Sequence, residues 1–264
     1  MAVKHRRSFL KRILAYQVLI TGINWSVLPR SVANFPAFVR DYRKYKQLNK
    51  RPSFDIKFNH LFPLLNDRTA AAGSFGWDYF HQDLWAARKI FQRRPSKHLD
   101  IGSSIDSFAA HLLVFMDVAV IDIRPLQSTV KGLTFVQDDA TTLTNFPDDS
   151  IDSLSTLNVA EHFGLGRYGD PVDPEACFTY MKSLQRVLAP GGVLYFAVPA
   201  GVEHVQFNAN RVFDVATILR EFEGLNLVSF SYVGKDGKLY EEANPFEPTP
   251  DLYSTALFEF TKQA

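Results

Sequence analysis

The sequence lacks paired cysteines, a long hydrophobic run and an excess of charge, and each absence excludes a class of protein. With one cysteine, Cys177, in 264 residues, the chain can form neither an internal disulfide framework nor a cysteine metal cluster. The net charge of +1 provides no overall basic field, so no nucleic-acid partner is expected. Hydrophobic residues make up 46% and charged residues 22%, which excludes a disordered chain. We therefore expect a globular, cytoplasmic protein with one sizeable core.

The N-terminal region combines basic residues with an interrupted apolar run. A basic stretch from Lys4 to Arg12 precedes the run Ile13–Leu28, which contains several polar residues. A membrane span needs about 20 apolar residues, and no small-residue cleavage site follows, so neither a transmembrane helix nor a signal peptide is expected. Two interpretations stay open. The segment is either a helix docked on the domain or a partner, or an interfacial helix in peripheral contact with an anionic membrane.

The hydrophobic pattern changes after Pro95. Residues 1–92 predict a helical extension broken by prolines, and residues 93–264 predict a separate domain in which short apolar runs alternate with helical patterns. This alternation indicates an α/β fold with a mostly parallel seven-stranded sheet, an antiparallel edge strand and helices on both faces. We expect strands at 98–101, 118–121, 134–136, 151–156, 193–198, 225–232 and 256–260, and helices at 105–115, 175–188 and 213–222.

Polar residues follow the first three predicted strands. The turn after the first strand contains one glycine, Gly102, whereas a dinucleotide fingerprint needs three, which argues against a pyrophosphate ligand. Asp122 ends the second strand 20 residues later, where a carboxylate can accept hydrogen bonds from ribose hydroxyls. Asp139 follows the third strand and is suited to an adenine amino group. Simple turn and cap roles compete with each of these interpretations.

An ordered series of motifs resembles the class I S-adenosylmethionine-dependent methyltransferases over residues 97–200. The motifs are Asp100-Ile101-Gly102, Asp122, Asp139-Ala140, residues 146–152 and Arg186–Gly192. The resemblance implies a Rossmann-like fold and S-adenosylmethionine as cofactor. It implies that Asp100 and Gly102 face the methionine part, Asp122 the ribose and Asp139 the adenine, with Ser103, Ile123, Ala140 and Asn158 completing the cofactor site. The first loop departs from the pattern, since Ser103 and Ser104 stand where further glycines are usual.

A resemblance to one uncharacterised methyltransferase-like family, a domain of unknown function, covers most of the chain. It rests on Phe80–Trp85, Asp100–Ser104, Ile121–Pro125, Glu161–Pro171 and Phe207–Arg211. This resemblance implies no defined reaction. It implies that these segments belong to one site.

The acceptor is expected beside the fourth predicted strand. His162 and Glu161 follow that strand and are the candidate catalytic acid-base pair, with capping of the loop as the competing role. Arg167, Tyr168 and Asp170 lie in a loop rich in glycine and proline, and Asn208 and Arg211 can reach the same place. Such groups suit a polar small molecule or glycan. We predict no metal, because Glu161, His162, Asp170 and Asp173 match no rigid ligand template.

Three functions remain open from the sequence. The first is an S-adenosylmethionine-dependent methyltransferase that modifies oxygen on a polar small molecule or glycan. The second is an NAD-dependent oxidoreductase, which the missing glycines disfavour. The third is a non-catalytic Rossmann-like binding or scaffold protein, which the serines of the first loop favour.

Overall fold

The computed structural model describes residues 28–57, 61, 63–65, 77–127, 129–247 and 253–263. The chain divides into two compact units, residues 1–74 and residues 75–264. The basic stretch Lys4–Arg12 and the apolar run Ile13–Leu28, except Leu28 itself, lie outside the described residues. The division falls earlier than the expected boundary at residue 92, because helix α3 (Trp77–Arg93) belongs to the larger unit.

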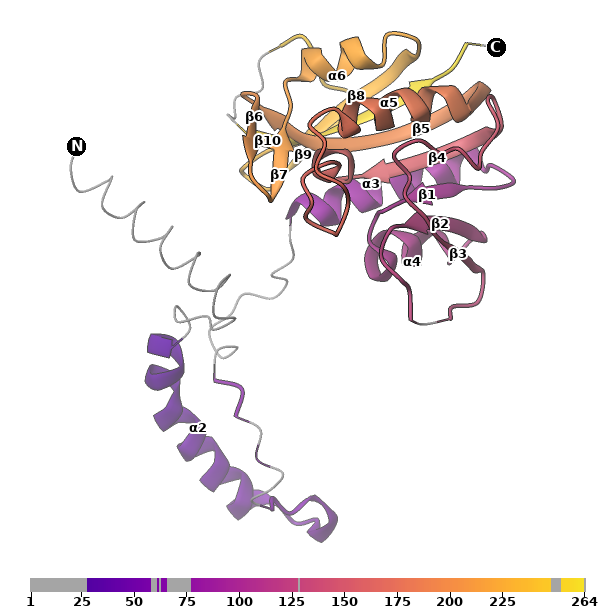
Figure 1. The fold of residues 1–264 in the computed structure, drawn as a ribbon. Coiled ribbons are helices and arrows are strands. Elements are labelled where there is room, and N and C mark those ends of the chain that lie inside the picture. The colour runs from indigo at the N-terminus through magenta and orange to yellow at the C-terminus, as the bar shows by residue number, and fades with distance from the viewer. Residues whose placement is uncertain are drawn as a thin grey trace, which may run out of the picture. The chain divides into compact units, whose positions relative to one another are not determined.

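An eight-stranded sheet forms the centre of the larger unit, in the order β3-β2-β1-β4-β5-β10-β8-β9 (Figure 1). Strands β1 to β5 pair in parallel, whereas β10 is antiparallel to both β5 and β8. All seven predicted strands are present, the last two of them pair antiparallel, and the short β9 adds an eighth. The strands are β1 (Leu99–Ile101), β2 (Val118–Asp122), β3 (Leu133–Gln137), β4 (Ile151–Leu157), β5 (Leu188–Gly201), β8 (Asn226–Val233), β9 (Leu239–Tyr240) and β10 (Tyr253–Thr261).

Strand β5 illustrates why this sheet is buried on both faces. Its residues 193–198 are apolar throughout, so successive side chains enter two different cores. Leu194 and Phe196 belong to one hydrophobic cluster, and Val193 and Tyr195 belong to the other. A run of this kind specifies a central strand with helices on either side.

Helices cover both faces of the sheet (Figure 1). Helices α5 (Ala176–Val187) and α6 (Val215–Glu221) pack on one face, while α3 and the short α4 (Ala110–Leu112) pack on the other. In α5 the buried side chains Cys177, Tyr180, Met181 and Leu184 recur with helical spacing. The expected helix at 105–115 forms only in part, because its first turn is the π-helix η5 (Ile105–Ala109).

A two-stranded hairpin between β5 and α6 was not predicted. It consists of β6 (His204–Gln206) and β7 (Asn210–Val212), which pair antiparallel. Opposite it, the 3-10 helix η6 (Ala160–His162) follows β4. The strands of the hairpin are short and largely polar, so they could not be recognised as apolar runs in the sequence.

The smaller unit is described over helix α2 (Leu28–Leu48) and the 3-10 helix η2 (Pro52–Phe54). Helix α2 contains Pro36 in its interior. Among the described residues, no helix has the length and apolar character needed to cross a membrane.

Candidate functional site

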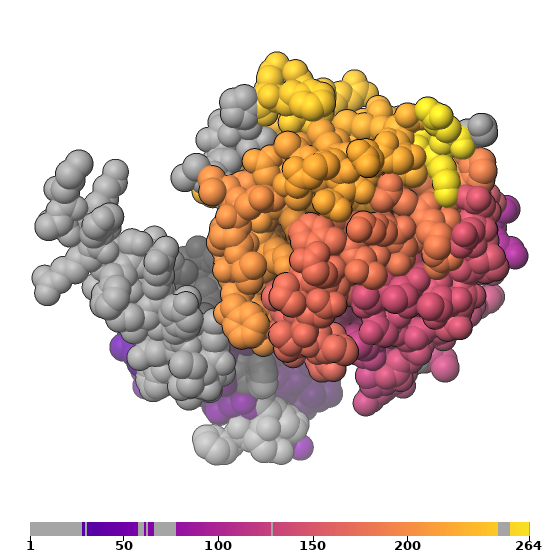
Figure 2. All heavy atoms as spheres, turned by 45° about the horizontal axis from the view of Figure 1, so that its top comes forward, coloured from indigo at the N-terminus to yellow at the C-terminus, as the bar shows by residue number. Residues whose placement is uncertain are grey.

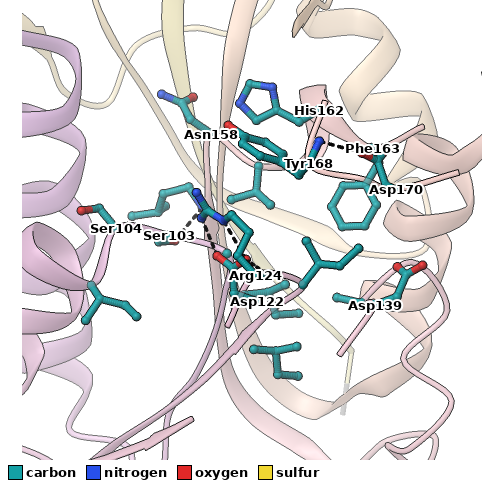
Figure 3. Close-up of a pocket in the computed structure, with 18 of the residues that line it drawn as sticks. Ser103, Ser104, Asp122, Arg124, Asp139, Asn158, His162, Phe163, Tyr168 and Asp170 are labelled. Carbon is teal, nitrogen blue, oxygen red and sulfur yellow. Dashed lines mark hydrogen bonds and ion pairs between the residues drawn. The ribbon is translucent and has the colours of Figure 1, made fainter. Parts of the chain in front are cut away.

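A cavity of about 390 Å³ lies where the carboxyl ends of β1 to β4 meet. Open α/β sheets bind ligands at this edge, because neighbouring loops diverge there and leave a crevice. In the view of Figure 3, Asp122 and Arg124 lie between Ser103 and Ser104 on one side and Asp139 on the other. Its lining is formed by Tyr79, residues 101–106, 121–124, 138–140 and 157–159, and His162, Phe163, Tyr168 and Asp170.

Gly102 brings the backbone close to the next loop. Its φ of +69° is in the left-handed region, and a Cβ at this position would lie 2.7 Å from Val159 Cγ1. The amide of Gly102 donates to Ile121 O at 2.8 Å, which ties the turn to β2. Any larger residue would have to displace the side chain of Val159, which also lines the cavity.

Asp100 lies beneath this turn and does not line the cavity, contrary to expectation. The side chain is fully buried and accepts hydrogen bonds from Ser103 N at 3.1 Å, Ser103 Oγ at 2.8 Å and Ser155 Oγ at 2.5 Å. Burial raises the pKa of Asp100 to about 7. Ser103 thus closes the loop on Asp100 from inside, and the role of Asp100 here is to shape the turn.

A polar chain continues from Asp100 into the sheet. His98 Nε2 lies 2.8 Å from Ser155 Oγ, and His98 Nδ1 lies 2.8 Å from Ser153 Oγ. Burial lowers the pKa of His98 to about 3, so the imidazole is neutral. One nitrogen therefore donates and the other accepts, and the serines satisfy both.

Asp122 ends β2 and reaches the cavity as predicted, but it already has a cationic partner. Arg124 donates to its carboxylate from Nε at 2.9 Å and from Nη2 at 2.5 Å, and the Arg124 amide adds a bond of 2.8 Å. This bidentate pair fixes the carboxylate and raises the pKa of Arg124. A ligand hydroxyl would meet a preoriented acceptor.

Asp139 and Asn158 also line the cavity. Asp139 caps its own turn, accepting from Thr141 N at 2.9 Å and Thr141 Oγ1 at 2.6 Å. Asn158 has a φ of +55°, and its buried Oδ1 has no hydrogen-bond partner. An unpaired buried acceptor costs free energy, so Asn158 Oδ1 is a position where a bound ligand donor would be favoured.

Glu161, which is buried, and His162, which is partly buried, lie side by side behind and at the cavity wall. His162 Nδ1 donates to Ala209 O at 2.8 Å, which leaves Nε2 facing Glu161 Oε1 at 3.7 Å. Burial raises the pKa of Glu161 to about 8 and lowers that of His162 to about 4. Both groups are therefore largely neutral near pH 7. His162 lines the cavity, whereas Glu161 lies behind it with Oε2 unpaired.

Tyr168 is held between cationic groups at the mouth of the cavity. The guanidinium carbons of Arg124 and Arg167 lie 4.9 and 5.0 Å from its ring centre, and the His162 ring meets it edge-on at 5.5 Å. Asp170 shapes this loop by accepting from backbone amides, among them Gly164 N at 2.9 Å. In Figure 2 the segment around residue 165 surfaces between the segments around residues 120 and 205.

The structure brings most of the predicted site residues together around the cavity and places the others outside its lining. Five do not line the cavity, and their side chains have other environments: Asp100, Glu161, Arg167, Asn208 and Arg211. Arg211 is buried and donates to Phe163 O at 2.6 Å, so it braces the site from behind. The residues that reach the cavity as predicted are Gly102, Ser103, Asp122, Ile123, Asp139, Ala140, Asn158, His162, Tyr168 and Asp170.

Sequence reasoning missed five polar residues of the lining, which are Tyr79, Ser104, Asp106, Arg124 and Asp138. Arg124 could have been found, because a guanidinium two residues after a strand-end aspartate can fold back onto it. Tyr79 gave no local signal. It comes from α3, far upstream in the chain, and only tertiary packing places it at the cavity.

Comparison with solved structures identifies the class of fold, which is that of the class I S-adenosylmethionine-dependent methyltransferases. The cyclase SpnF is 13% identical, with a TM-score of 0.50, over 69% of this chain and 82% of its own. A proposed sarcosine dimethylglycine methyltransferase from Galdieria sulphuraria is 12% identical, with a TM-score of 0.50, over 69% of this chain and 86% of its own. At these identities the likeness concerns the fold alone.

The particular family follows from the sequence. A family model described as "Caenorhabditis protein of unknown function, DUF268" matches residues 110–243, about half of the chain, and the chain belongs to this family. The match extends from α4 to the loop after β9 and includes the loop that carries His162 and Tyr168. No curated protein matched the sequence.

Proposed function

We propose that the cavity binds S-adenosylmethionine and that the chain transfers its methyl group to oxygen on a polar small molecule or glycan. The observation that carries the proposal is the juxtaposition of the Gly102 turn, the Asp122 carboxylate and Asp139 around one cavity. A volume of about 390 Å³ suits a small-molecule ligand. When bound, S-adenosylmethionine supplies an electrophilic methyl group on a sulfonium centre.

The residues present fit this cofactor. Gly102 leaves room that a Cβ would fill, and the buried Oδ1 of Asn158 offers an acceptor without a partner. Asp122 would accept from ribose hydroxyls, while Ile123 and Ala140 provide apolar contact for the adenine. Aspartates on the lining also favour a cationic ligand over an anionic one.

His162 is the residue we assign to the proton of the acceptor. Its Nδ1 is engaged with Ala209 O, so only Nε2 can accept a proton. Because its pKa is lowered to about 4, His162 is unprotonated and available at neutral pH, although it is a weak base there. Arg167 and Tyr168 at the mouth would bind and align the acceptor. Alignment is the larger contribution, because in-line displacement depends on the approach of two atoms.

Calorimetric titration of the full chain with S-adenosylmethionine, S-adenosylhomocysteine and NAD tests the cofactor. We expect both sulfur nucleosides to bind and NAD not to bind. Asp122→Ala should weaken binding by about 1.5–3 kcal/mol, roughly 10- to 150-fold, because a charged acceptor is lost. Asp152→Ala, on the exposed side of β4, is the matched control and should leave binding unchanged.

The other outcomes of this titration have definite meanings. Preference for NAD would support an oxidoreductase, and binding of neither compound would support a non-catalytic scaffold. If S-adenosylhomocysteine binds, methyl transfer from labelled S-adenosylmethionine to nucleotide sugars and oligosaccharides tests the acceptor class. His162→Gln should then lower the rate by about 10²–10⁴-fold while cofactor affinity stays within a factor of two or so. Full activity of His162→Gln would remove His162 from that role.

A further inference from the structure

Helix α2 presents an apolar stripe that the described part of its unit leaves uncovered. Leu28, Val32, Phe35, Val39 and Tyr42 recur at helical spacing and therefore lie along one side of the helix. Such a stripe normally packs into a core. Here Val32 is 66% exposed and Phe35 52% exposed, and none of the described residues of this unit is buried.

Positive charge is concentrated in the second half of α2 and in the residues that directly follow it. Residues 39–57 contain seven lysines and arginines against two aspartates, a local charge of +5 in a chain whose total is +1. Within the described part of this segment, Arg40 Nε pairs with Asp41 Oδ1 at 3.1 Å. Apolar and cationic side chains adjoin in a shallow groove along the helix, lined by Phe35, Pro36, Val39, Arg40, Arg43, Lys44 and Gln47.

We propose that α2 binds the surface of a membrane containing anionic phospholipids. The helix lies in the plane of the interface, with its apolar stripe at the boundary of the acyl chains and its cations near the headgroup phosphates. Arg43 borders the stripe, Arg40 and Lys44 lie farther round the helix on the same side, and their long side chains can reach outward to the phosphates. This proposal is independent of the cavity, so its failure would leave the proposed function untouched.

The charges favour a lipid surface over a second copy of the chain. Lys46 lies five turns along from Leu28 on the same side of the helix, so a paired helix would place an ammonium group in the apolar seam. Two copies would also bring two segments of charge +5 together. Nucleic acid would satisfy the cations but gives no reason for Leu28 and Val32 to be exposed.

Co-flotation of the full chain with lipid vesicles is the direct test. One set of vesicles is phosphatidylcholine alone, and the other is phosphatidylcholine and phosphatidylserine in equal parts. We expect the chain to float with the anionic vesicles and to remain behind with the neutral ones. Raising the salt concentration should weaken the association, because exposed charges are screened.

Two sets of substitutions separate the parts of the proposal. Each interfacial cation contributes roughly a factor of five, so Arg40→Gln, Arg43→Gln and Lys44→Gln together should weaken partition roughly 100-fold. Val32→Ser with Phe35→Ser should weaken it roughly 10-fold or more at unchanged charge. The matched control neutralises three exposed cations of the larger unit, Arg88, Lys97 and Lys131, and should float like the parent. Circular dichroism and urea denaturation verify that each variant is folded.

Three results would overturn the proposal. Equal flotation with neutral and anionic vesicles, or none with either, would show that anionic lipid is not the partner. Flotation lost equally in the control variant would assign binding to general charge. Light scattering that shows a dimer, converted to a monomer by Val32→Ser and Phe35→Ser without loss of flotation, would assign the stripe to self-association instead.

Discussion

Gly102 is the residue on which the shape of the cavity depends most directly. Its left-handed backbone disfavours any side chain, and its neighbour Val159 leaves no room for one. The two effects differ in kind. Backbone strain lowers stability alone, whereas displacement of Val159 also moves a residue that lines the cavity.

Gly102→Ala should therefore be more damaging than the same substitution at Gly191, a glycine with a similar backbone conformation but open surroundings. Gly191 has a φ of +74°, and a Cβ there would meet nothing within 4 Å, so Gly191→Ala isolates the backbone strain. We expect Gly191→Ala to cost roughly 1–2 kcal/mol of the free energy of unfolding and to leave S-adenosylhomocysteine affinity unchanged. Gly102→Ala should cost more and also weaken binding. Equal effects in urea denaturation and calorimetry would show that the close contact is unimportant.

At the scale of elements, the β6–β7 hairpin braces the loop that carries His162. Arg211 of β7 is buried and donates to Phe163 O at 2.6 Å and to Pro174 O at 3.3 Å. Ala209 O, between the two strands, accepts from His162 Nδ1 and from Arg167 Nη1, both at 2.8 Å. The hairpin thus fixes both ends of the loop and the tautomer of His162.

Replacing Arg211 tests this bracing. Arg211→Met keeps most of the apolar stem but leaves buried carbonyl oxygens without donors, so we expect a loss of about 2–3 kcal/mol in the free energy of unfolding. Arg220→Met, at an exposed position of α6, should change it by less than about 0.5 kcal/mol. Urea denaturation measures both. A variant at position 211 as stable as the control would mean that water replaces the guanidinium.

The elements that the sequence predicted well are those with a local signal. Strands β2 and β5 contain continuous apolar runs, and α5 carries its buried residues at helical spacing. The residues of β6 are exposed and carry no such pattern. The π-helical turn η5 also differs from expectation, because Asp83 of α3 accepts a hydrogen bond from Ser107 within it, a contact that depends on tertiary packing.

The site could be predicted in position but not in detail. Parallel strands bring their carboxyl ends to one edge, so Asp122 and Asp139 were expected near each other from topology alone. Whether a strand-end side chain points to the cavity or beneath a turn depends on its neighbours. Asp100 turns inward because Ser103 and Ser155 offer it three donors, and those contacts form only in the fold.

At the scale of the whole molecule, three buried titratable groups and the partly buried His162 link stability to pH. Burial lowers the pKa of His98 to about 3 and of His162 to about 4, and raises that of Asp100 to about 7 and of Glu161 to about 8. Between pH 4.5 and 6.5 the unfolded chain has ionised carboxylates and protonated histidines. The histidine contributions to stability rise with pH in this range while the carboxyl contributions fall, so they offset each other.

Above pH 6.5 the histidine contributions level off and the carboxyl contributions dominate, so stability should fall until the folded-state pKa of Glu161 is passed near pH 8. Each group that binds one more proton in the folded state lowers the free energy of unfolding by about 1.4 kcal/mol per pH unit. We expect the free energy of unfolding to fall by about 2 kcal/mol between the pH at which unfolded histidine loses its proton and the folded-state pKa of Glu161, with most of the loss from Glu161. Glu161→Gln, which stays neutral, should remove that part, whereas Glu223→Gln at an exposed position should retain it. Urea denaturation at both pH values measures the difference, and an unchanged loss in Glu161→Gln would mean that this carboxyl is already ionised in the folded chain.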